Sequence, residues 1–273
     1  MIGNKITIKK QIRNIISNFG IDVIRHRKSP YEYLLGQPRY ELKKINLIGK
    51  TFNVADGHSF YYSHREIFID EIYKFHAANS SPNILDCGSN YGTSIIYFKQ
   101  LYPDAKITGV EADPGIYDLL EHNISQHDYS DVKLLNMAVS TSSQPVKFFS
   151  EGADGGRLHK LDDPNHTYEI NSITLDNLIE GQVDFLKMDI EGAESEVLLN
   201  STKLSQVEQM FIEYHSFEDD TQSLGELLAC LSKNDFKYYI HTQFCSKRPL
   251  TEKSTQLGMD MQLNIFAKRN LST

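Results

Sequence analysis

Four short stretches of this sequence place carboxylates, glycines or a histidine directly after an apolar run. They are DCGSNYG at 86–92, Glu111 in VEADP, DFLKMDIEGAE at 184–194 and FIEYHSF at 211–217. This pattern is typical of buried strands that end at a ligand site, because ligands of open α/β sheets lie outside the carboxyl ends of the strands. We therefore expect the four stretches to meet at one edge of a sheet.

The first stretch predicts a turn that approaches a ligand closely. Gly88 and Gly92 allow backbone conformations that side chains disfavour, and the helix expected after them presents free N–H groups. The spacing is G-x-N-x-G, which differs from the G-x-G-x-x-G of dinucleotide-binding proteins. Asp86, at the end of the strand, suits a cationic or hydrogen-donating ligand better than a pyrophosphate. Glycines after a strand also form ordinary tight turns.

Glu111 ends the next apolar run, 25 residues after Asp86. An acid in this position can accept hydrogen bonds from both hydroxyls of a ribose. The alternative is that Glu111 complements the N-terminus of the helix that begins at Pro114. The glycine turn beside it favours the ribose interpretation.

The last two stretches carry groups for acid–base or metal chemistry. His215 is our candidate general base, because imidazole titrates near neutrality, and Asp189 either orients the acceptor or is the base itself. Glu191 is a second candidate contact. Asp189, Glu213 and His215 also have the donor types that bind Mg or Mn. The alternatives are a helix cap for Asp189, a polar strand end for His215 and helix electrostatics for Glu194.

A parallel sheet is needed to bring these residues together. From residue 83 the sequence alternates apolar runs with helical patterns, which predicts a mostly parallel sheet with helices on both faces. The last two runs are joined by a loop alone, so we expect an antiparallel last strand. Seven strands are expected at 83–88, 106–112, 132–139, 183–189, 208–215, 236–241 and 262–269, with a hairpin strand at 145–149. Helices are expected at 93–101, 114–126, 193–199 and 222–233.

The chain before this alternation has a different pattern. Residues 4–19 form a basic amphipathic pattern, and residues 45–62 predict short strands broken at Gly49 and at an Asp56-Gly57 hairpin turn. A helix is expected at 63–77. We interpret residues 1–62 as a cap or acceptor-binding extension and residues 63–273 as the main domain.

The basic helix at 4–19 has two interpretations. It packs on the domain or on a second copy in a homo-oligomer, or it lies on an anionic membrane surface near a lipid-linked acceptor. Its short apolar face favours packing. The polar, glycine-containing stretch at 150–168 is expected to be an irregular loop.

Composition excludes several classes of protein. A net charge of −8 argues against a nucleic-acid partner, although residues 1–28 carry seven basic side chains against one acid. Cys87, Cys230 and Cys245 are widely spaced, which disfavours disulfides and zinc and fits a cytoplasmic protein. No apolar run approaches the ~18 residues of a membrane span.

Taken together, the motifs resemble the FkbM family of S-adenosylmethionine-dependent methyltransferases, which are mostly O-methyltransferases. The similar segments are NILDCGSNYGTSIIYFKQLYP, GVEADP, NMAVS, SITLDNLI, VDFLKMDIEGAESEVL and FIEYHSF. They run from about residue 83 to 217. KMDIEGAE after a TLD element is the most specific of them, whereas the glycine turn by itself indicates only a Rossmann-like class I methyltransferase fold. Residues 1–82 match loosely.

The resemblance implies a cofactor site and a reaction. The backbone of Met137-Ala138-Val139 would border the adenine of S-adenosylmethionine, and Glu111 would hold its ribose. The methionine part would be held by the turn that contains Asp86, Gly88, Ser89, Asn90 and Gly92. The implied reaction is in-line methyl transfer to a sugar hydroxyl of a surface glycan or a related metabolite, with a divalent cation as an option.

Three other functions remain open at this stage. The acceptor could be a small molecule that is not a sugar. A nicotinamide-dependent oxidoreductase would share the sheet and the ribose acid, but the third glycine of its fingerprint is missing. A non-catalytic cofactor-binding module would not need both KMDIEGAE and EYHSF. An Asn/Asp-Pro-Pro-aromatic motif, usual for methylation of nucleic-acid amino groups, does not occur in the sequence.

Overall fold

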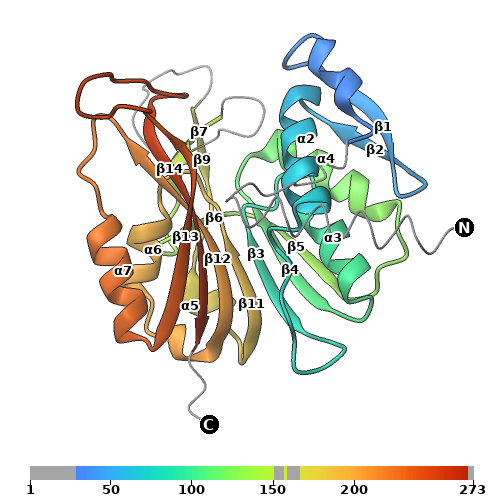
Figure 1. Ribbon diagram of the computed structural model, residues 1–273. Helices are drawn as coiled ribbons and strands as arrows, with labels where there is room; N and C mark the ends of the chain where they lie inside the picture. Colours follow the sequence, from blue (N-terminus) through green and yellow to red (C-terminus); the bar gives the residue numbers. More distant parts are fainter. Residues whose placement is uncertain (1–28, 151–156, 159–166, 270–273) are drawn as a thin grey trace, which may run out of the picture.

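A seven-stranded sheet forms the centre of the molecule (Figure 1). The computed structural model describes residues 29–150, 157–158 and 167–269. The strand order is β13-β14-β12-β11-β3-β4-β5. The bounds are β3 Asn83–Cys87, β4 Lys106–Glu111, β5 Val132–Asn136, β11 Val183–Met188, β12 Val207–Phe217, β13 Phe236–Cys245 and β14 Met259–Arg269.

The direction of the strands confirms the expected α/β fold. The pairs β11–β12, β11–β3, β3–β4 and β4–β5 are parallel, whereas β14 runs antiparallel between β12 and β13. A sheet of this kind, with helices between successive parallel strands, is the Rossmann-like class I fold. The carboxyl ends of β3, β4, β11 and β12 therefore share one edge.

Helices cover both faces of the sheet. Figure 1 shows α6 and α7 on one side and α3 and α4 on the other. Phe185 belongs to the core under α3 and α4, whereas its neighbour Leu186 belongs to the core under α5, α6 and α7, because successive strand residues point to opposite faces. The bounds are α3 Thr93–Leu101, α4 Pro114–Ser125, α5 Leu175–Leu178, α6 Glu194–Asn200 and α7 Leu224–Lys233.

The segment before the sheet differs from the expectation at one point. A hairpin of β1 (Lys43–Leu47) and β2 (Lys50–Val54) turns at Gly49, as predicted. Asp56 does not form the second turn. Its carboxylate accepts the N–H groups of His58 and Ser59 and so caps α2 (Gly57–His64). The sequence Asp-Gly fits both a hairpin turn and a helix start, and in the folded chain the same carboxylate also accepts from the side chain of Arg39 and the N–H of Tyr40.

The prediction of a helix at 63–77 is also wrong in its bounds. The helix α2 ends at His64 and continues as one π-helical turn, η2 (Arg65–Ile69), after which the chain to Pro82 has no helix. A short 3-10 helix, η1 (Glu32–Gly36), precedes the hairpin. The proposed boundary between residues 62 and 63 falls inside α2, and the rings of Phe52 and Phe60 contact that of Tyr91.

The expected strand at 132–139 is divided in two. The N–H of Met137 donates to the carbonyl of Glu111 at the end of the β4–β5 pairing, and the next N–H, that of Ala138, donates to the carbonyl of Asn171 instead. The chain resumes as β6 (Ala138–Ser140), which pairs in parallel with β10 (Ser172–Thr174). Part of the expected loop at 150–168 forms strands: β8 (Arg157–Leu158) and β9 (Thr167–Ile170) pair with β7 (Val146–Phe149). The expected helix at 4–19 lies outside the described residues.

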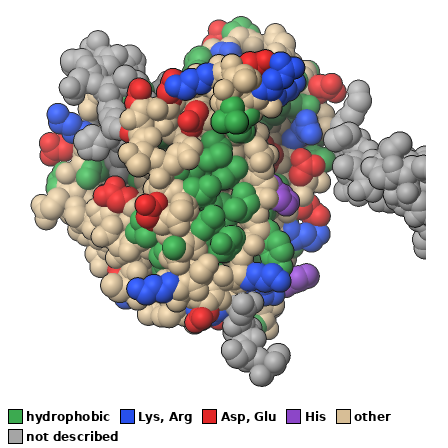
Figure 2. All heavy atoms as spheres, turned by 60° about the vertical axis from the view of Figure 1, so that its left-hand side comes forward, with side chains coloured by type: hydrophobic (Ala, Val, Ile, Leu, Met, Phe, Trp, Pro, Cys, Tyr) green, Lys and Arg blue, Asp and Glu red, His purple; other side chains and the backbone are tan. Residues whose placement is uncertain are grey.

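One edge of the sheet bears on the expected homo-oligomer. The edge strand β13 exposes Tyr239 (56%) and Ile240 (39%). Figure 2 brings this side of the molecule forward and shows apolar side chains running down the middle of the view. Self-association stays a prediction.

Within the described ranges, none of the helices combines the length and the apolar character that a membrane crossing requires.

Candidate active site

A cavity of about 690 Å³ lies at the carboxyl ends of β3, β4, β11 and β12. This volume is in the range of small-molecule sites. The cavity has two ends of different character. One is formed by the turn after β3, the end of β4 and the start of β6. The other is formed by the ends of β11 and β12 together with α2, η2 and the β13–β14 pair.

The turn after β3 touches the end of β11 directly. Gly88 has φ +85°, and a Cβ there would lie 1.7 Å from the carbonyl oxygen of Asp189. Gly92 has φ +96°, and a Cβ there would lie 2.9 Å from Leu120 on α4. Gly88 therefore lines the cavity, whereas Gly92 shapes the start of α3 and does not line it. Ser89 and Asn90 line the cavity, as predicted for a binding turn.

Glu111 lies beside this turn and lines the cavity. Its two carboxylate oxygens accept the N–H groups of Asn90 (2.8 Å) and Asp113 (2.9 Å), and the residue is 9% exposed. Burial raises its pKa to about 7. Ala138, at the start of β6, lines the same end. The helix-electrostatics alternative does not describe Glu111, because it is Asp113 whose side chain caps α4.

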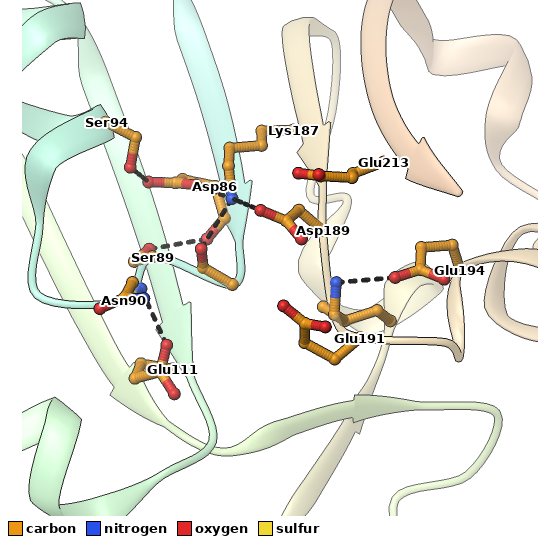
Figure 3. Close-up of polar contacts among 12 residues, drawn as sticks. Asp86, Ser89, Asn90, Ser94, Glu111, Lys187, Asp189, Glu191, Glu194 and Glu213 are labelled. Atoms are coloured by element: carbon orange, nitrogen blue, oxygen red, sulfur yellow. Dashed lines mark hydrogen bonds and ion pairs between the residues drawn. The ribbon is translucent and has the colours of Figure 1, made fainter. Parts of the chain in front are cut away.

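Asp86 is placed differently from the expectation. Its side chain is fully buried and does not line the cavity. Its Oδ2 accepts the hydroxyl of Ser94, and its Oδ1 lies 3.5 Å from the Nζ of Lys187. The cationic partner that we expected to come from a ligand is thus a lysine of the neighbouring strand, as Figure 3 shows. From the sequence, Lys187 was expected inside the strand as a partner of a neighbouring carboxylate, and the structure confirms this pairing.

The other end of the cavity is rich in acids. Asp189, Glu191 and Glu213 line it, with Glu66 from η2. Glu213 accepts the side-chain amide of Gln262. Burial and, after it, the charge of Asp189 raise the pKa of Glu213 well above its ordinary value. The predicted acids of the two strand ends therefore lie together. Glu66 lies with them but was not predicted, because it is more than 100 residues away in the sequence.

His215 lies behind this end of the cavity. Its side chain is fully buried, with Nδ1 3.0 Å from Glu194 Oε1 and Nε2 3.6 Å from Glu191 Oε2. Burial alone would lower the pKa of His215, but the carboxylates of Glu191 and Glu194 outweigh it and raise the pKa well above its ordinary value. An imidazole in this setting holds two carboxylates and does not line the cavity.

Glu194 has a larger role than the expected helix electrostatics. It is 1% exposed and accepts the N–H groups of Ile190 (3.0 Å) and Gly192 (3.0 Å) as well as contacting His215. It therefore shapes the loop that carries Glu191. Glu194 was missed because an acid in the first turn of a helix is common, and its partner lies 21 residues further along the chain.

One group of these residues has the geometry of a metal site. Ligand atoms of Asp189, Glu191 and His215 all lie within 4.8 Å of one another. The predicted set contained Glu213 in place of Glu191, and Glu213 is not part of this group. Glu213 and His215 lie two residues apart on β12, whereas Glu191 reaches His215 from the loop after β11.

Residues 86–238, more than half of the 273 residues, match the family model described as Methyltransferase FkbM domain. The chain belongs to this methyltransferase family, as the motifs had indicated. It is 29% identical to Methyltransferase sdnD of Sordaria araneosa, over 50% of this chain and 66% of that protein. It is 26% identical to 2-O-methyltransferase NoeI of Sinorhizobium fredii, over 50% of this chain and 65% of that protein. The chain thus spans slightly less than two thirds of the length of these relatives.

Similar solved structures include a methyltransferase FkbM from Methylobacillus flagellatus KT, at 16% identity and a TM-score of 0.45, which covers 70% of this chain and 45% of that one. Another is the TYW2 protein of M. jannaschii in complex with AdoMet, at 13% identity and a TM-score of 0.47, covering 86% and 89%. Neither likeness is close enough to carry an argument about this chain.

The raised pKa of Glu111 predicts a pH dependence of stability. In the unfolded chain its carboxyl loses its proton near pH 4.5, whereas in the folded chain it does so near pH 7. The stabilisation is therefore complete below pH 4.5 and is lost as the pH rises to about 7, up to about 3 kcal/mol. The free energy of unfolding is measured in urea between pH 5 and 8, and Glu111→Gln should make it depend less steeply on pH than in the wild type. Glu121→Gln, exposed on α4, should keep the wild-type slope; an unchanged slope in Glu111→Gln would contradict the assignment.

Proposed function

We propose that this protein transfers a methyl group from S-adenosylmethionine to a hydroxyl group of its acceptor. The observation that carries the proposal is the cavity of a methyltransferase-family chain, with a glycine turn and a buried acid at one end and an acid-rich wall at the other. When bound, S-adenosylmethionine supplies a methyl group on a positively charged sulfur. Its sulfonium suits a cavity that carries more carboxylates than cations.

The residues at the turn fit this cofactor. Thr93, at the start of α3, lines the cavity and is 3% exposed, yet its hydroxyl has no hydrogen-bond partner. A buried hydroxyl without a partner is costly, so a polar group of a ligand is the natural partner. Glu111 keeps lone pairs on both carboxylate oxygens for the ribose hydroxyls. Ser89, Asn90 and Ala138 complete this end.

Asp189 is the proposed base. A hydroxyl is a poor nucleophile until its proton is removed, so a group that accepts this proton must face the acceptor. The side chain of Asp189 is 20% exposed and lines the cavity beside the cofactor turn. His215 was the first candidate for this role, but its ring is enclosed by Glu191 and Glu194. We assign His215 the positioning of Glu191, which is a second contact for the acceptor.

A sugar is the proposed acceptor. NoeI, one of the relatives, is named a 2-O-methyltransferase. The acceptor end combines carboxylates with the amides of Gln243 and Gln262 and the rings of Tyr62 and Phe244. Carboxylates accept hydrogen bonds from hydroxyls, amides both donate to them and accept from them, and the aromatic rings offer apolar faces. A surface glycan or a related metabolite fits this lining, and the net charge of −8 is consistent with an acceptor that is not a nucleic acid.

Cofactor binding is tested by calorimetry with S-adenosylmethionine and with NADH. The wild-type chain should bind S-adenosylmethionine, and Thr93→Val should weaken this binding about 5- to 10-fold, the effect of one lost hydrogen bond. Thr51→Val, on the exposed part of β2, is the control and should bind as the wild type does. Binding of NADH without binding of S-adenosylmethionine would refute the proposed function in favour of an oxidoreductase.

The role of Asp189 predicts a loss of turnover. Asp189→Asn should reduce methyl transfer about 100-fold or more while changing the affinity for S-adenosylmethionine less than about 10-fold. The assay measures radiolabel passing from methyl-labelled S-adenosylmethionine to a panel of mono- and oligosaccharides. Asp118→Asn, exposed on α4, serves as the control. Full turnover in Asp189→Asn would show that the base lies elsewhere.

We further propose that a Mg or Mn ion is held by Asp189, Glu191 and His215. Carboxylates and imidazole are suitable ligands; the ion would replace the proton of Nε2 that faces Glu191, while the contact of Glu194 with Nδ1 would orient the ring. Such an ion would lower the pKa of an acceptor hydroxyl. The group is formed by the loop after β11, which carries Asp189 and Glu191, and by strand β12, which carries His215.

The cation is tested by titrating Mn²⁺ and following its electron paramagnetic resonance signal. The wild-type chain should bind one Mn²⁺, and Glu191→Gln should weaken this binding about 10-fold or more. Glu196→Gln, exposed on α6, should bind as the wild type does. Absence of Mn²⁺ binding would leave Glu191 and His215 as an ion pair without metal.

A further inference from the structure

A buried lysine lies between the two ends of the cavity. Lys187, on β11, is the register partner of Asp86 on β3. It also precedes Asp189 by two residues, and residues two apart in an extended chain point to the same side. The backbone alone therefore brings one ammonium group between two carboxylates, and Figure 3 shows its nitrogen there.

Lys187 makes one hydrogen bond and two ion pairs inside the protein. Its Nζ lies 2.7 Å from the carbonyl oxygen of Gly88, 3.2 Å from Asp189 Oδ2 and 3.5 Å from Asp86 Oδ1. An ammonium group has three N–H donors and no acceptor. The ring of Tyr73 lies 5.8 Å from Nζ, and Lys187 is 2% exposed. The side chain is thus buried, with its ammonium group between two carboxylates and the Gly88 carbonyl.

Each contact of Lys187 belongs to a different part of the site. Gly88 belongs to the turn that we assign to the cofactor, and Asp189 is the proposed base. The backbones of the two segments are also joined, because the N–H of Asp189 donates to the carbonyl of Cys87, the residue before Gly88, at 3.1 Å. Burial alone would lower the pKa of Lys187, but Asp189 and then Asp86 outweigh it and raise the pKa above its ordinary value.

We propose that Lys187 is a positioning residue that couples the cofactor turn to Asp189, by holding the Gly88 carbonyl and the Asp189 carboxylate with one ammonium group. The inference rests on the proposed function and adds a residue to it. Removal of the ammonium would leave the buried carboxylate of Asp86 and that of Asp189 facing each other without a cation. Both the turn and the base would then lose their arrangement together.

A second buried lysine provides a matched control. Lys99, on α3, is 4% exposed and donates to the carbonyls of Pro103 and Ala105. It resembles Lys187 in burial and in donating to the backbone, but it does not line the cavity. A change of Lys99 therefore reports what the loss of a buried ammonium does to the fold without an effect on the site.

The experiment is a double-mutant cycle on Lys187→Met and Asp189→Asn. The affinity for S-adenosylmethionine is measured by calorimetry, and the urea midpoint is measured on the same proteins. In the wild-type background, Lys187→Met should weaken binding about 10-fold or more. In the Asp189→Asn background, the loss caused by Lys187→Met should be smaller by a factor of about 5 or more. Lys99→Met should lower the urea midpoint and leave the affinity within about 2-fold of the wild type.

The outcomes separate this inference from the proposed function. If the wild-type chain binds S-adenosylmethionine and the two changes are additive in affinity, the coupling through Asp189 is overturned while the function stands. An equal loss of affinity in Lys99→Met would show that Lys187 acts only through stability, which also overturns it. If the wild-type chain does not bind the cofactor, the proposed function fails, and additive changes in the urea midpoint would then overturn the coupling as well.

Discussion

The arrangement of the site depends on one ammonium group buried among two carboxylates and a carbonyl. Lys187 contacts Asp86, Asp189 and the carbonyl of Gly88, and a charge at this depth is stable only with such partners. The partners come from β3, from the turn after it and from the end of β11. The parallel pair of β3 and β11 therefore lies at the centre of the sheet and also borders the cavity.

The acceptor end is organised by a second buried contact. Glu194 binds the loop N–H groups of Ile190 and Gly192 and contacts His215, and His215 in turn contacts Glu191. This chain of contacts places Glu191 beside Asp189 in spite of the positive φ of 59° at Glu191. A loop with that backbone strain keeps its shape when buried partners determine it. The cofactor end is held by contacts from two neighbouring strands: Glu111 accepts the N–H of Asn90, and Lys187 donates to the carbonyl of Gly88.

Much of the fold could be predicted from the sequence. The regular alternation after residue 83 predicted the seven strands, and α3 has the bounds that were expected. The prediction failed where local patterns are ambiguous. Asp56 caps α2 and also accepts hydrogen bonds from Arg39 and Tyr40, and the strand expected at 132–139 breaks after Met137, where the N–H of Ala138 donates to the carbonyl of Asn171. Both outcomes depend on contacts between segments, which propensity does not contain.

The sequence by itself determined the family, the sheet and the set of polar residues at its edge. It did so because strand ends, glycine turns and acid motifs are local features, and parallel strands carry them to one edge. The tertiary structure decided which of these residues face the cavity. Asp86 and His215 have the right types and positions, yet both are buried against Lys187 and Glu194 respectively. Direction and burial of a side chain depend on neighbours from other strands, and the spacing along one strand cannot reveal them.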